Sequence, residues 1–110
     1  MPVLRRVDLG RREEYYRRLD EFAASIKETL PVEEVILFGS FATGEIHEGS
    51  DIDLIVIGDF KERFHERIGK IMALTDLPIE PLVYTRQEFE EMKAQGNSFI
   101  LEVVKTGRIL

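Results

Sequence analysis

The sequence contains no cysteine and no tryptophan, and its only histidines are His47 and His65. The lack of cysteine excludes disulfide bonds and thiolate zinc sites, and two isolated histidines argue against a histidine-rich metal centre. No apolar run approaches the roughly 20 residues that a transmembrane helix needs. The segment Met1–Arg6 also lacks the hydrophobic stretch of a signal peptide. We therefore expect a cytoplasmic protein that does not associate with membranes.

Positive charge is also scarce, because 15 Lys and Arg residues against 21 Asp and Glu residues give a formal net charge of −6. Proteins that grip a long nucleic-acid backbone usually show the opposite balance, so we expect no extended nucleic-acid binding. Six arginines nevertheless cluster near the N-terminus: Arg5, Arg6, Arg11, Arg12, Arg17 and Arg18. The acidic residues among them favour a solvated helix face, with a docking surface for an acidic partner as the alternative.

The chain of 110 residues is 44% hydrophobic and 33% charged, which predicts one domain, residues 1–110, with a modest core. Apolar residues spaced by three and four predict a helix from Arg11 to Leu30, which Pro31 ends. Further helices are predicted over 61–75, from a capping box at 85–88 to residue 95, and from Asn97 or Ser98 to 105. Strands are predicted over 35–38, 52–57 and 79–84.

A glycine-serine turn follows the first predicted strand, in the segment Leu-Phe-Gly-Ser-Phe-Ala-Thr-Gly over residues 37–44. A strand that enters a glycine turn and then a helix directs backbone N–H groups at one spot, which suits a phosphate. We expect Ser40 to be the N-cap of a short helix over 40–43. Gly39 and Ser40 are therefore candidate phosphate-binding residues, and an ordinary tight turn is the alternative.

Two aspartates, Asp51 and Asp53, begin the second predicted strand. Residues i and i+2 of a strand share a face, with Cα atoms roughly 6.5–7 Å apart. Two carboxylates at that spacing can reach one or two cations, and those cations can reach triphosphate oxygens. Asp51 alone would fit a turn or cap, but Asp53 lies between Ile52 and Leu54, where an unpaired acid is costly.

A third acidic residue, Glu80, lies near the start of the third predicted strand, beside Pro81. Proline cannot donate to the ladder, so this strand is expected at an edge of the sheet or near its own start. In both acidic strands the acid comes first and apolar same-face residues follow, which predicts a site at the rim of a sheet. The alternative is that Glu80 faces solvent.

Together these residues resemble the signature of the minimal nucleotidyltransferases, small relatives of the polymerase β-type enzymes. The resemblance runs from the helix before Val35 to the C-terminal segment 97–110. It implies a nucleotidyltransferase fold of the α/β (α+β) class, with a mixed central sheet and helices packed mainly on one face. It also implies transfer of a nucleoside monophosphate, AMP above all, from an NTP such as ATP to a hydroxyl. In that scheme Asp51, Asp53 and Glu80 hold two Mg²⁺ ions, and Gly39 and Ser40 hold the β- and γ-phosphates.

One departure from the family pattern concerns Thr43. Many relatives read Gly-Ser-x-Ala-Arg-Gly, and this chain has Thr43 where that arginine would stand. A cation facing the phosphates would then be missing from this position. A nucleotide-binding module without catalysis is therefore an alternative to an active enzyme.

The resemblance also implies a partner. Small proteins of this kind often resemble the antitoxin half of a toxin–antitoxin pair whose other half is an all-helical RNase. The antitoxin adenylylates a tyrosine of the toxin or simply occludes it. No separate acceptor-binding domain is evident in this chain, which favours a helical protein as the acceptor. The apolar segment Phe99–Val104 either covers the sheet or forms an interface, with a partner or with a second copy of the chain.

Overall fold

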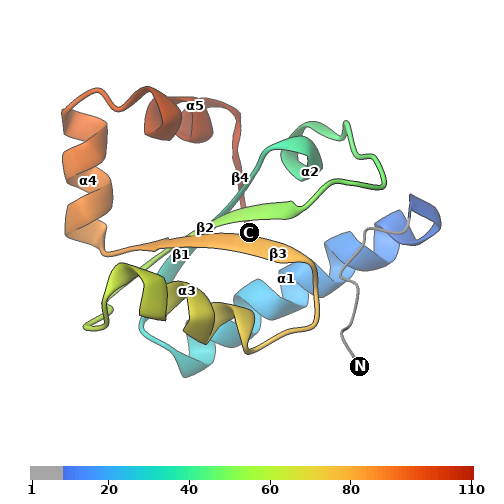
Figure 1. Ribbon diagram of the computed structural model, residues 1–110, viewed down its shortest axis with the longest axis horizontal. Coiled ribbons are helices and arrows are strands. Elements are labelled where there is room, and N and C mark those ends of the chain that lie inside the picture. The colour runs from blue at the N-terminus through green and yellow to red at the C-terminus, as the bar shows by residue number, and fades with distance from the viewer. Residues whose placement is uncertain (1–8) are drawn as a thin grey trace.

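The computed structural model describes residues 9–110 and shows a four-stranded sheet between helices (Figure 1). The α/β class predicted from the sequence is confirmed. The elements in chain order are η1 (Leu9–Arg11), α1 (Arg12–Thr29), β1 (Val32–Phe38), α2 (Ser40–Thr43), β2 (Ile52–Gly58), α3 (Phe64–Met72), β3 (Ile79–Tyr84), α4 (Arg86–Ala94), α5 (Ser98–Thr106) and β4 (Arg108–Ile109). Arg5 and Arg6 of the arginine cluster lie outside the described residues, as does the Met1–Arg6 segment.

The sheet is mixed, with the strand order β3-β2-β1-β4. Strand β1 pairs antiparallel with β2 and β4, and β2 pairs parallel with β3. Because β3 lies at an edge of the sheet, its Pro81 does not interrupt a ladder on both sides, as the sequence predicted. Among the described residues, no helix is long and apolar enough to cross a membrane.

Helices cover both faces of the sheet unequally (Figure 1). The larger hydrophobic cluster joins α1 and α3 to one face, and the smaller cluster joins α4 and α5 to part of the other. The mixed sheet with its main helical cover on one face is thus as predicted. The central strand β2 is buried along most of its length because helices pack against both of its faces. Asp53 is the polar exception within it.

Local signals account for the ends of the two C-terminal helices. The predicted capping box at the start of α4 is present, with Thr85 and Glu88 each bonding the other's backbone N–H. Gly96 has a φ of +74°, the left-handed conformation that stops a helix. The Asn97 side chain then accepts a hydrogen bond from the Ile100 N–H and caps α5.

Several boundaries differ from the predictions. Gly39, not Ser40, is the N-cap of α2, because the left-handed backbone of Gly39 turns the chain into the helix one residue earlier. Helix α3 is shorter than predicted, since Arg63 is still extended. Strand β1 begins at Val32, before a bulge in its pairing with β2. Strand β4 was not predicted, because two residues are too few to show an alternating pattern.

Candidate active site

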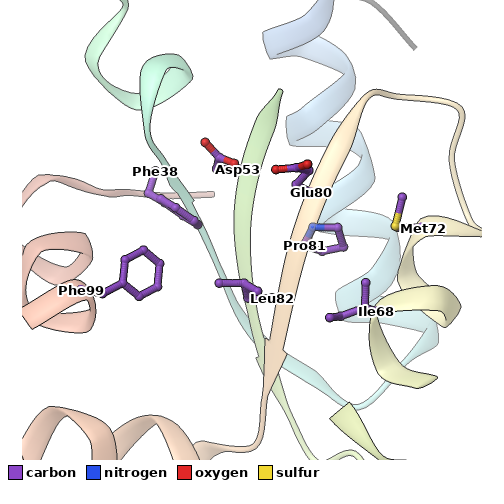
Figure 2. Close-up of a pocket in the computed structure, with 8 residues that line it drawn as sticks. All are labelled: Phe38, Asp53, Ile68, Met72, Glu80, Pro81, Leu82 and Phe99. Carbon is purple, nitrogen blue, oxygen red and sulfur yellow. The ribbon is translucent and has the colours of Figure 1, made fainter. Parts of the chain in front are cut away.

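Asp53 and Glu80 lie side by side at the start of two parallel strands. The register pairs Asp53 of β2 directly with Glu80 of β3, and directly paired residues point to the same face of a sheet. Figure 2 shows both carboxylates at the same end of a pocket. The prediction that these acids lie at the rim of the sheet therefore agrees with the register of the strands.

The pocket beside the two acids has a volume of about 490 Å³ and a mostly apolar wall (Figure 2). Its other lining residues are Phe38, Ile68, Met72, Pro81, Leu82 and Phe99. Phe38 lies beside Asp53 because the register of β1 and β2 pairs the two residues. Phe99 comes from α5 and meets Phe38 edge to face, with ring centroids 5.3 Å apart. The pocket therefore combines a polar end, suited to charged groups, with a wall suited to a ring or an alkyl chain.

The charge on Asp53 is destabilised by its surroundings. Partial burial raises its pKa, and the negative charges of Glu80 and Asp51 raise it further, to about 6. Grouped carboxylates that repel each other are stabilised by a bound cation. The electrostatics of the site thus favour a proton or a cation beside Asp53.

The glycine-serine turn lies directly against Asp53. Gly39 has a φ of +71°, and a Cβ atom at this position would overlap Oδ2 of Asp53. Only glycine satisfies both the backbone conformation and the space. The turn and the acid, which are separated in the sequence, therefore form one continuous site.

The loop that carries Asp51 is folded on itself. The Ser50 hydroxyl accepts a hydrogen bond from the His47 N–H at 3.0 Å, and the Ser50 N–H donates to the His47 carbonyl at 2.9 Å. The Gly49 N–H donates to Nδ1 of His47 at 3.2 Å. His47 therefore shapes the turn. Ser50, which the sequence analysis did not single out, is buried and anchors the residue before Asp51.

The fit of this site to a metal ion is partial. Its carboxylate oxygens are the donors that Mg²⁺ prefers, and the structure brings Asp53 and Glu80 together. Asp51 acts on Asp53 through its charge, but its side chain is exposed. Within residues 9–110, no three His, Cys, Asp or Glu side chains are grouped so that they could hold a metal ion as they stand. The carboxylate donors suit Mg²⁺. The structure does not bring the three predicted ligands, Asp51, Asp53 and Glu80, into one group.

Thr43 and the arginines of η1 and α1 lie at or near the surface. The Thr43 hydroxyl donates to the Ser40 carbonyl at 3.3 Å and accepts from the Glu45 N–H at 3.4 Å, so it closes the end of α2. Arginines of α1 and the preceding turn form ion pairs with nearby acids: Arg11 with Glu14, Arg17 with Glu21, and Arg18 with Asp76. These pairs agree with the interpretation of a solvated helix face.

The comparisons with known proteins place the chain in a family. The model of the nucleotidyltransferase domain family matches residues 19–109, and the chain belongs to this family. A curated relative, named "putative protein adenylyltransferase" of Methanocaldococcus jannaschii, is 29% identical over 97 residues, which are 86% of this chain and 95% of the relative.

Two solved structures share the fold. The crystal structure of a protein from Sulfolobus solfataricus, described as a "putative nucleotidyltransferase", superimposes with a TM-score of 0.61 at 20% identity, over 76% of this chain and 78% of that one. The crystal structure of a toxin–antitoxin with AMP-PNP gives a TM-score of 0.54 at 18% identity, over 84% of this chain and 69% of that one. At these identities the likeness establishes the nucleotidyltransferase fold.

Proposed function

We propose that this chain, acting as a single domain, transfers a nucleoside monophosphate, AMP, from an NTP to a hydroxyl group of a partner protein. The observation that carries the proposal is the contact between two sequence motifs. The Gly39 turn lies against Asp53, and Asp53 lies beside Glu80 at one end of a pocket. Membership of the nucleotidyltransferase family supports the reaction class. The name of the Methanocaldococcus relative supports a protein as the acceptor.

In this proposal Asp53 and Glu80, with Asp51 drawn in from the adjoining loop, hold Mg²⁺ ions. Bound Mg²⁺ would supply Lewis-acid activation and neutralise the charge of the triphosphate. The carboxylates of Asp53 and Glu80 would hold the cation at the polar end of the pocket, beside the Gly39 turn. Gly39 and Ser40 receive the β- and γ-phosphates through backbone N–H groups and the serine hydroxyl.

The chemistry is a single displacement at phosphorus. The acceptor oxygen forms a bond to the α-phosphorus, the bond from that phosphorus to the α–β bridging oxygen breaks, and pyrophosphate leaves. The acceptor hydroxyl loses its proton, which a carboxylate of the site or water takes up. Holding the two reactants in line would supply much of the rate enhancement.

The surface beside the pocket suits a protein partner. Helix α5 exposes Phe99, Leu101 and Val104, whose exposed fractions are 41%, 46% and 49%. Phe99 also lines the pocket that contains Asp53 and Glu80. A helical partner that covers α5 would therefore bring its own surface to the edge of the site. The likeness of the fold to a chain of a toxin–antitoxin structure supports a partner of this kind.

A second function has one observation in its favour. The Thr43 side chain bonds within its own short helix, and threonine cannot supply a positive charge to a phosphate. A chain that binds ATP and blocks a helical RNase toxin, without transferring AMP, would tolerate this substitution. The two functions differ in whether the partner gains mass.

The experiment that separates them is co-expression with the neighbouring gene product, followed by intact mass spectrometry of the partner after incubation with Mg²⁺ and ATP. We expect the partner to become heavier by one or more AMP units. Asp53→Asn should abolish the gain in mass, whereas Glu66→Gln, a change to an exposed acid of α3, should not. An unmodified partner that nevertheless stays bound would favour occlusion. Modification of a small molecule by the chain alone would contradict a protein acceptor.

A further inference from the structure

Helix α2, which follows the Gly39 turn, is tied to helix α1 by two hydrogen bonds. The Tyr16 hydroxyl donates to the Phe41 carbonyl at 2.6 Å, across 25 residues of sequence. The Arg12 guanidinium donates to the Gly44 carbonyl at 3.2 Å. One acceptor lies within α2 and the other is its C-cap. The short helix is therefore held at both positions by side chains of α1.

Packing reinforces these bonds. The Phe41 ring is buried and meets the rings of Tyr15 and Tyr16 edge to face, at centroid distances of 6.2 and 5.7 Å. Guanidinium groups of Arg12 and Arg108 lie 6.0 and 5.5 Å from the centre of the Tyr16 ring. Cation–π attraction favours this arrangement and limits the rotation of the phenol. The Tyr16 hydroxyl is therefore directed at the α2 backbone by its surroundings.

Helix α1 provides a fixed reference for α2. It extends over 18 residues, and Leu19, Ala23 and Ile26 anchor it to the sheet as fully buried residues. Gly39, immediately before α2, leaves no space for even a methyl group beside Asp53. A small displacement of α2 would consequently change the distance between the turn and the carboxylate. The contact with α1 sets that distance from outside the pocket.

We propose that Tyr16 is a positioning residue, which fixes the Gly39–Ser40 turn above Asp53 through its hydrogen bond to Phe41. The inference rests on the proposed function, since the nucleotide is what the positioned turn receives. This hydrogen bond restrains α2 relative to α1. The bond stabilises the position of the turn. The core beneath α1 does not depend on the hydroxyl group.

The test is Tyr16→Phe, which keeps the ring, its packing against Phe41 and its contacts with the arginines. We expect the Kd of the Mg²⁺ complex of AMP-PNP to rise about fivefold by calorimetry, within the range of one lost hydrogen bond. Hydrogen exchange of the backbone amides over 40–44 should accelerate while α1 stays protected. Tyr84→Phe is the matched control, because Tyr84 lies at the far end of β3 and its ring packs against that of Phe64. It should change neither the Kd nor the exchange over 40–44.

A second variant, Arg12→Gln, removes the other bond and should also weaken AMP-PNP binding while leaving the melting temperature close to wild type. Equal affinity of wild type and Tyr16→Phe, or a loss of affinity that merely follows a loss of overall stability, would overturn the inference. If the wild-type chain itself binds no AMP-PNP, the proposed function fails, and the inference fails with it. The two failures are therefore distinguishable.

Discussion

Gly39 and Asp53 are in such close contact that a Cβ atom on residue 39 would overlap the Asp53 carboxylate. The glycine turn ends β1, and Asp53 is the register partner of Phe38, the last residue of that strand. A backbone turn with a positive φ therefore lies next to a carboxylate whose pKa is raised. This contact makes the turn and the acid one site.

Gly39→Ala should both destabilise the fold and abolish nucleotide binding. An alanine would be strained at a φ of +71°, at a cost of about 1 kcal/mol or more, and its Cβ would push Asp53 aside. Thermal melts and AMP-PNP titration measure the two effects. Gly69→Ala is the control, because Gly69 lies in α3 and a Cβ atom added there would meet no atom of the described residues within 4 Å. It should stabilise the helix by about 0.5–1 kcal/mol. If Gly39→Ala melts and binds as wild type does, the close contact is wrong.

In the absence of metal, the contribution of Asp53 to stability should fall as the pH rises between its ordinary pKa of 3.8 and its folded value of about 6. The folded chain keeps the proton in this window, while the unfolded chain has lost it, so stability decreases with pH. A shift of this size corresponds to about 3 kcal/mol at full strength, and solvent screening of a partly exposed carboxylate reduces it to about 1 kcal/mol.

Asp53→Asn should remove that pH dependence and melt at or above the wild-type temperature near neutral pH, because it relieves repulsion from Glu80 and Asp51. Melting curves recorded with a chelator at several pH values provide the check. A variant that melts well below wild type without metal would show that Asp53 has a structural role instead. Glu66→Gln should leave the curve unchanged.

Mg²⁺ should raise the melting temperature of the wild-type chain and should do so much less for Glu80→Gln. A ligand that binds only the folded state stabilises it in proportion to its affinity, and Glu80 is one of the two paired carboxylates. The measurement is a Mg²⁺ titration followed by thermal melts. An equal response in wild type, Glu80→Gln and Glu66→Gln would place the cation elsewhere on the protein.

Changes to the exposed side of α5 should release the partner without unfolding the chain. The pair Leu101→Ser and Val104→Ser alters two side chains that are about half exposed, so the fold should survive. Pull-down of the co-expressed partner should drop severalfold. Leu74→Ser, a comparably exposed residue after α3, is the control. Retention of the partner by the α5 variant would exclude this helix as the interface.

The sequence indicated much of the site because its signals are local. Asp53 stood out as an acid within an aliphatic strand, and Gly39 as the residue that ends a strand in a turn. The pairing of Glu80 with Asp53 depends on the parallel register of β2 and β3, which no local pattern encodes. The family resemblance, and not periodicity, predicted that Glu80 belongs to the same site as Asp53.

Other features could not be predicted from the sequence, for physical reasons. The contact from Tyr16 to Phe41 spans two elements, and the helical period shows only that Tyr16 lies near an apolar face. The buried Ser50 looks like any loop serine until its bonds to His47 are seen. The two-residue strand β4 exists only because Arg108 and Ile109 pair with β1.

We propose that the centre formed by Gly39, Asp53 and Glu80 transfers a nucleoside monophosphate to a protein. The most direct measurement incubates the chain and its co-purified partner with Mg²⁺ and ATP that is labelled on either the α- or the γ-phosphate. We expect the α-label, and not the γ-label, to become covalently attached to the partner, and Asp53→Asn to abolish the attachment. Attachment of the γ-label, or α-labelling that persists in Asp53→Asn, would contradict the proposal.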